Sequence, residues 1–67
     1  MTYKVILAGG REILVSQEDR DRLREEITAP FAPIAPRPAA PVYIAQQLNG
    51  PKGILIMAAH VVAIEEQ

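Results

Sequence analysis

The chain contains no cysteine and no tryptophan, and it has one histidine, one serine and one phenylalanine. Without cysteine there can be no disulfide and no thiolate metal site, and one histidine excludes a multi-histidine site within a chain. Nucleophilic catalysis needs a nucleophile, a base and an orienting group, but Ser16 is better explained as a helix cap and His60 lies in an apolar run. Zinc bound by His60 with Glu65 and Glu66 is a weak alternative. We therefore expect no enzymatic activity and no cofactor.

The chain also lacks a large excess of either charge. Its net charge is −1, so no overall positive field attracts nucleic acid. The longest apolar run, residues 53–64, is too short for a membrane helix, which needs about 20 residues. Residues 1–4 do not have the form of a signal peptide. We expect a cytoplasmic protein that binds no membrane and for which nucleic acid is not the main partner.

The chain is rich in apolar residues for its size. It has 67 residues, of which 49% are hydrophobic. A domain this small buries only about 60% of the surface of its unfolded chain, so it is marginal without a disulfide, a metal or a partner subunit. Since the first two are missing, the apolar excess predicts a homo-oligomer.

Two strand-like runs, residues 3–8 and 11–16, flank Gly9-Gly10, which favours a two-residue type I′ turn. Residue i then pairs with residue 19 − i. This register divides the hairpin side chains between two faces, one with Lys4, Ile6, Ala8, Arg11, Ile13 and Val15 and the other with Tyr3, Val5, Leu7, Glu12, Leu14 and Ser16. Both faces are apolar in the middle, so covering them predicts a second layer or subunit.

A helix is expected to begin after the N-cap Ser16, with Asp19 at the third helical position, and to end at Ile27 or Thr28. Arg20, Arg22 and Arg24 of this helix can bind an anion, and Arg20 and Arg24 share a face. Interleaved acidic residues instead favour a solvated outer face.

Residues 29–41 form a Pro-rich strap in which Ala-Pro-x occurs three times. Polyproline II has three residues per turn, so Phe31, Ile34 and Arg37 are expected in one stripe. We expect Phe31 and Ile34 to pack on the core. Contact with a neighbouring subunit and binding to a proline-recognising groove are the alternatives.

Further strands are expected at residues 42–48, 54–57 and 60–65, with a turn at 49–53 and a kink at Ala58-Ala59. The alternative for residues 57–67 is a helix. The whole pattern predicts one small α+β domain, residues 1–67, with an antiparallel sheet that an oligomer completes.

Two Gly-rich loops each carry a cation, Arg11 in one and Lys52 in the other, and their backbone N–H groups can hold an anion. Stacking and cationic groups suit a nucleotide-like ligand, so the candidate ligand-binding residues are Arg11, Lys52, Tyr3, Tyr43 and His60. Plain hairpin turns are the alternative. The candidate interface residues are Phe31, Ile34, Ile54, Ile56 and Val61.

Two phrases of the sequence resemble small accessory proteins of phages and mobile elements: Val5-x-Leu7-x-Gly9-Gly10-x-x-Ile13-x-Val15-Ser16-x-Glu18 and Ile56-x-x-x-His60-Val61-Val62-x-Ile64-Glu65. The resemblance implies binding to a host protein or to a small signalling molecule, and it assigns no functional residue. The leading hypothesis is a non-enzymatic homo-oligomeric binding module of an accessory or inhibitor type. The alternative is a structural or assembly subunit whose strap locks neighbours together.

Overall fold

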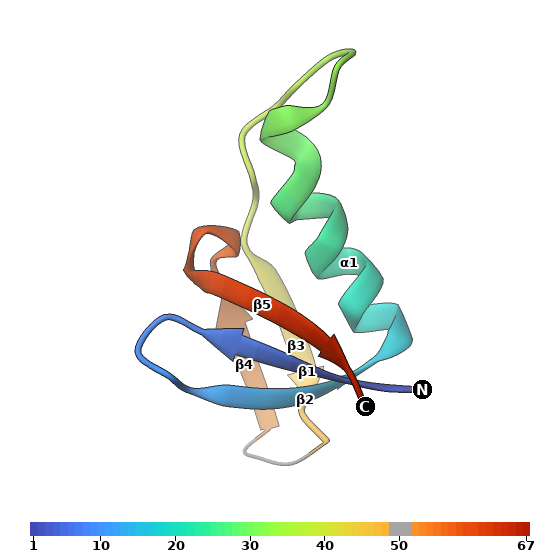
Figure 1. The fold of residues 1–67 in the computed structure, drawn as a ribbon, viewed down its shortest axis with the longest axis vertical. Coiled ribbons are helices and arrows are strands. Elements are labelled where there is room, and N and C mark those ends of the chain that lie inside the picture. The colour runs from blue at the N-terminus through green and yellow to red at the C-terminus, as the bar shows by residue number, and fades with distance from the viewer. Residues whose placement is uncertain (49–51) are drawn as a thin grey trace.

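The protein has the α+β fold that the sequence predicts (Figure 1). The computed structural model describes residues 1–48 and 52–67, and of Gln46 and Lys52 only the backbone. In this part of the chain the elements are β1 (Thr2–Leu7), β2 (Glu12–Ser16), α1 (Gln17–Thr28), the 3-10 turn η1 (Ala29–Phe31), β3 (Val42–Gln46), β4 (Lys52–Ile56), the 3-10 turn η2 (Ala58–His60) and β5 (Val61–Glu66). Most of the predicted turn at 49–53 lies outside the described residues.

The apolar run near the C-terminus forms strands, and the alternative helix over residues 57–67 is wrong. β4 ends at Ile56, η2 occupies the predicted kink, and β5 begins at Val61. The β-branched side chains of this segment favour extended backbone. Hydrogen bonding of β5 to β1 then fixes the strand.

The strands form two small antiparallel sheets, with the orders β2-β1-β5 and β3-β4. The backbone N–H of Leu48, just after β3, donates to the carbonyl of Leu14 in β2 at 3.0 Å and ties the two sheets together. α1 lies along one side of this pair of sheets, and the strap rises from its C-terminal end (Figure 1).

The core lies between the two sheets and α1. α1 begins as predicted, because the Ser16 hydroxyl oxygen accepts a hydrogen bond from the Asp19 N–H at 3.3 Å, and it ends at Thr28. Leu23 is its fully buried residue. It packs with buried side chains from four strands: Tyr3, Val5, Ile13, Val15, Val42, Ile44 and Ile56. Ile27, one helical turn further on, also packs against this cluster, so α1 is held to the sheets through one apolar face.

The register of the first hairpin differs by one residue from the prediction. Val5 pairs with Ile13 rather than with Leu14. The cause is a longer loop: Gly10 N–H donates to the Leu7 carbonyl at 3.0 Å and Leu7 N–H donates to the Arg11 carbonyl at 2.8 Å, which leaves three residues between the bonded residues Leu7 and Arg11. Gly9 and Gly10 have φ values of 90° and 87°.

This shift sorts the hairpin side chains more cleanly than expected. Tyr3 and Val5 now share the buried face with Ile13 and Val15. The opposite face alternates charged and apolar residues, and its Lys4 and Glu12 lie 3.6 Å apart. The expectation of two faces that are both apolar in the middle is therefore wrong, and the argument for a partner subunit that rested on it fails.

The strap does not form one extended polyproline stripe. It begins with η1, bends at residues 33–35 where Ala35 has φ of 55°, and returns so that Arg37 N–H donates to the Ala29 carbonyl at 3.2 Å. Phe31 and Ile34 are 82% and 85% exposed, so the expectation that they pack on the core is wrong. The result is a loop that projects at one end of the long axis (Figure 1).

Candidate functional site

The ligand-binding residues predicted from the sequence do not gather in one place. Tyr3 is buried beside α1, whereas Tyr43 is exposed on β3. Arg11 and His60 line a common hollow. The side chain of Lys52 lies outside the described residues. The structure thus brings Arg11 and His60 to one hollow and places Tyr3 and Tyr43 elsewhere.

The hollow that Arg11 and His60 share has a volume of about 310 Å³. It lies where the tip of the first hairpin meets η2, and Ala8 N–H donates to the His60 carbonyl at 2.7 Å. Ile54 and Ile56, both predicted interface residues, contribute to its apolar wall. Within the described part of the chain the Arg11 guanidinium has no ion pair, so this hollow offers one free cation beside an apolar surface.

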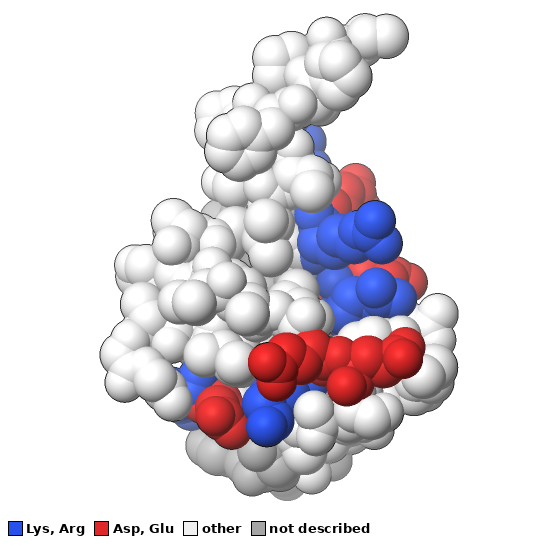
Figure 2. Space-filling model, viewed as in Figure 1, with Lys and Arg blue, Asp and Glu red and all other residues white. Residues whose placement is uncertain are grey.

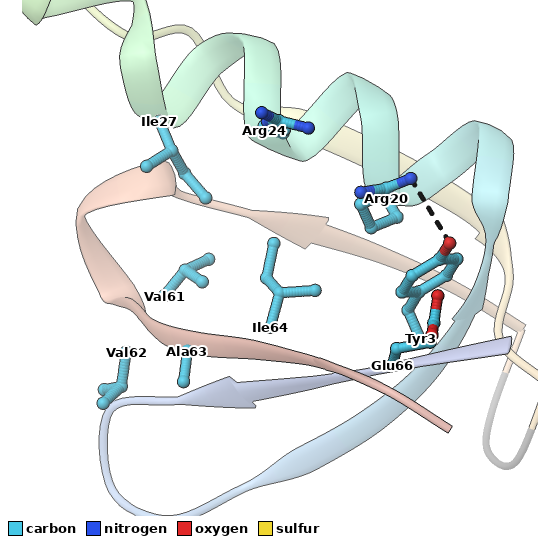
Figure 3. A pocket seen from close by; sticks show the side chains of 9 residues that line it. All are labelled: Tyr3, Arg20, Arg24, Ile27, Val61, Val62, Ala63, Ile64 and Glu66. Atoms are coloured by element: carbon cyan, nitrogen blue, oxygen red, sulfur yellow. Dashed lines mark hydrogen bonds between the residues drawn. The ribbon is translucent and has the colours of Figure 1, made fainter.

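A larger groove runs between α1 and β5, with a volume of about 610 Å³ (Figure 3). One wall comes from α1 through Arg20, Arg24 and Ile27, and the other from β5, with Tyr3 at one end. Five residues of β5 complete the lining: Val61, Val62, Ala63, Ile64 and Glu66. The groove is thus apolar along much of its length with cations on one side.

The two walls of the groove run in opposite directions. The Arg20 guanidinium lies 4.3 Å from the centre of the Tyr3 ring, and Tyr3 pairs with Glu66 at the end of β5. Ile27, near the other end of α1, lines the groove together with Val61 at the start of β5. Arg24 lies between these two levels, because it is one helical turn from Arg20 and three residues from Ile27. α1 is therefore antiparallel to β5.

β5 has a free edge on the side of the groove. In the described ranges its strand neighbour is β1 alone. Gln67 N–H donates to the Thr2 carbonyl at 3.0 Å, which fixes the alternation of the antiparallel ladder. The pairs Lys4–Glu65 and Ile6–Ala63 then exchange the bonds to β1. Ile64 lies between Ala63 and Glu65, and Glu66 follows Glu65. The backbone N–H and carbonyl groups of Ile64 and Glu66 therefore point away from β1, toward the free edge.

Two opposite charges of this groove, Arg24 and Glu66, have no ion-pair partner in the described part of the chain. No ion pair or hydrogen bond found among residues 1–48 and 52–67 uses the side chain of Arg24 or of Glu66. Arg20 donates from Nη2 to the Tyr3 hydroxyl at 3.3 Å. The Arg20 Nε atom lies 2.9 Å from Oδ1 of Asp21, but its N–H does not point at that oxygen. The Nε–H is therefore buried without a hydrogen bond. Figure 2 shows basic side chains on α1 next to an acidic band on the same face.

The ligand-binding residues predicted from the sequence include neither cation of this groove, Arg20 or Arg24. Arg20 and Arg24 gave a usable signal, their shared helix face at i, i+4 spacing, but the neighbouring acids favoured a solvated surface. Tyr3 was predicted as a stacking residue, yet it is only 6% exposed and Arg20 covers one face of its ring. Its ring therefore forms part of the end of the groove.

The projecting loop is held by one carboxylate. Both oxygens of Glu26 accept from the Arg37 guanidinium, at 2.7 and 2.8 Å, and Oε1 also accepts from the Ala40 N–H at 2.9 Å. The hydrogen bonds from Arg37, then that from Ala40, lower the pKa of Glu26 to about 2. The loop is thus braced while its two large apolar side chains, Phe31 and Ile34, stay exposed.

Two further findings concern the whole described chain. Its helix is too short and too polar to span a bilayer. No three histidine or acidic side chains in the described ranges gather closely enough to hold a metal ion.

Comparison with protein-family models, curated proteins and solved structures finds no match to this chain.

Proposed function

We propose that this protein is a non-enzymatic binding module that takes an extended acidic segment of a partner protein into the groove between α1 and β5. The observation that supports this function is the free edge of β5 lining a groove whose opposite wall carries the unpaired Arg24. Following the resemblance to accessory proteins of phages and mobile elements, the partner protein would be one made by the host.

Strand addition suits this edge because it supplies unpaired backbone groups in a regular row. An extended segment gains main-chain hydrogen bonds from the N–H and carbonyl groups of Ile64 and Glu66, and its alternate side chains enter the groove. Ile27, Val61 and Ile64 offer an apolar wall for them. A carboxylate on the incoming segment pairs with Arg24, which selects acidic over basic segments.

A small anionic ligand is the second candidate, and the Arg11–His60 hollow is the observation that favours it. Arg11 is a free cation there, and a short apolar anion would fill about 310 Å³ against Ile54 and Ile56. A nucleotide is less well supported in the main groove, since the ring of Tyr3 is already covered by Arg20.

The experiment uses a fluorescent synthetic peptide with the sequence of residues 61–67, an extended apolar and acidic probe, and measures its binding by anisotropy with dilute protein. We expect Arg24→Glu to weaken binding at least tenfold, a loss of about 1.4 kcal/mol. Arg11→Glu is the matched control, because it changes the charge equally at a free arginine outside the groove. A peptide with glutamine in place of its two glutamates is expected to bind more weakly than the acidic peptide.

Equal loss of binding in both arginine variants would mean that only net charge matters, and no binding by the native protein would refute strand addition at this edge. Loss in Arg11→Glu alone would transfer the site to the hollow.

A further inference from the structure

We infer that the strand which fills the groove first is β5 of a second copy of this chain, so that two copies pair edge to edge around a two-fold axis. This inference rests on the proposed function, because it names the occupant of the same groove. Two features support a second copy as the occupant. β5 is itself an apolar and acidic strand, like the expected ligand, and its place at the edge of the sheet allows two copies to pair symmetrically.

The charges of one chain are complementary to those of another. Arg24 on α1 and Glu66 on β5 line the same groove, and within the chain they are not paired with each other. In a two-fold pair each copy brings both groups, so the contact between Arg24 of one copy and Glu66 of the other forms twice. Two like surfaces carrying only one sign would repel, whereas this arrangement joins opposite charges.

The register follows from the free backbone groups. We place the two-fold axis at Ile64, so that the Ile64 residues of the two copies lie opposite each other. Because the N–H and carbonyl of Ile64 both point outward, the two residues exchange both hydrogen bonds, as the antiparallel ladder requires. Counted along the strand, Glu66 of the second copy then lies at the level of Val62, where the register of β5 with β1 shifts by one residue. At that level the wall of α1 lies between Arg24 and Ile27, because α1 runs antiparallel to β5. Arg24 and Ile27 are about 4.5 Å apart along the helix axis, which is within the length of an arginine side chain, so this register places Glu66 of the second copy within reach of Arg24.

Pairing also covers apolar surface that one chain leaves open. Val62 is 69% exposed, and Val61, Ile64 and Ile27 are only half-buried along the groove. A standard interface covers about 800 Å² of each partner, a large share of the 4446 Å² surface of this small chain. One strand pair with its groove covers less than that, so we expect a dimer with a Kd on the order of 10 μM rather than a permanent one.

The test measures the dimer Kd by sedimentation velocity of the full chain over a concentration series. We expect Arg24→Glu and Glu66→Arg each to weaken the dimer at least tenfold, and the double variant to recover to within about threefold of the native Kd, because the reversed charges pair again. Arg11→Glu is the matched control and should leave the Kd unchanged. Circular dichroism establishes that each variant is folded.

A second variant tests the backbone without changing charge. The chain is short enough for chemical synthesis, and a methyl group on the Ile64 nitrogen removes an outward N–H while the bonds to β1 remain. We expect at least a tenfold weaker dimer.

A chain that stays monomeric to 1 mM (about 100 times the expected Kd), or a dimer insensitive to both charge reversals, overturns the inference. If the monomer still binds the peptide of residues 61–67 through Arg24, the proposed function stands and only the second copy is excluded. If neither dimer nor peptide binding occurs, both fail.

Discussion

Replacing Gly53 by alanine tests the most sharply defined contact of the second sheet. Gly53 has φ of 60°, in the left-handed region, and it lies in β4 under the side chain of Tyr43 from β3. A Cβ atom at this position would overlap the Tyr43 hydroxyl oxygen and come within 3.2 Å of Cζ. The substitution therefore has two separate costs, one from the backbone and one from the ring.

The two costs can be estimated separately. The left-handed conformation costs a non-glycine residue about 1–2 kcal/mol, and turning the half-exposed Tyr43 ring out of its rotamer adds about 0.5–1.5 kcal/mol. A chain of 67 residues at about 0.05–0.15 kcal/mol per residue has roughly 3–10 kcal/mol of total stability. Gly53→Ala should thus remove a large part of the free energy of unfolding.

The assay is urea unfolding followed by circular dichroism, in a cycle with Tyr43→Phe. Tyr43→Phe alone should change stability by less than about 0.5 kcal/mol, because the side chain is half-exposed and surface changes are usually small. In that background Gly53→Ala should cost at least about 0.5 kcal/mol less than in the native chain, since the hydroxyl is gone. Gly10→Ala is the control for backbone cost alone, because φ is 87° but nothing lies within 4 Å of its added Cβ. An equal cost of Gly53→Ala in both backgrounds would show that the Tyr43 hydroxyl does not lie over Gly53.

Three further outcomes follow from the core and the strap. Leu23→Ala should lower the free energy of unfolding by about 2–5 kcal/mol, because Leu23 is fully buried and joins α1 to the sheets; urea unfolding measures it. Glu26→Gln should lower the melting temperature at pH 7, because it removes the carboxylate that holds Arg37. The folded-state pKa of Glu26 is lowered from 4.5 to about 2, so the difference in melting temperature between variant and native chain should be full above pH 4.5 and disappear as the pH falls through about 2. Phe31→Ser with Ile34→Ser should leave the stability of the monomer within about 1 kcal/mol, since both side chains are exposed, while loss of assembly in this variant would favour the structural role of the strap.

The elements could be predicted from the sequence because each has a local cause. Ser16 caps α1 through a hydrogen bond to a residue three positions away, and β-branched residues favour the extended backbone of β5. The hairpin register could not be predicted, because Gly9-Gly10 is compatible with loops of two and of three residues and the packing of Val5 with Ile13 decides between them.

The strap and the groove depend on contacts between distant parts of the chain. The Ala-Pro-x repeat favours polyproline II, but Arg37 bonds to Glu26, eleven residues earlier, and so bends the strap back. The groove exists because β5 pairs with β1 and leaves its other edge beside α1. No local pattern predicts which strand of a sheet is at the edge, so Arg24 and Glu66 could be assigned to one site only from the fold.

The glutamates of β5 allow a competing explanation that can be separated from pairing. Edge strands often carry charges that prevent association with other chains, and Glu65 and Glu66 could serve that purpose. In an antiparallel pair about Ile64, however, Glu66 faces Val62 and the Arg24 wall rather than its own copy, so its charge attracts. Glu66→Gln should therefore weaken the dimer in sedimentation velocity, more strongly at low than at high salt. Stronger association of this variant would show that Glu66 protects the edge, and Arg24 would then need another partner.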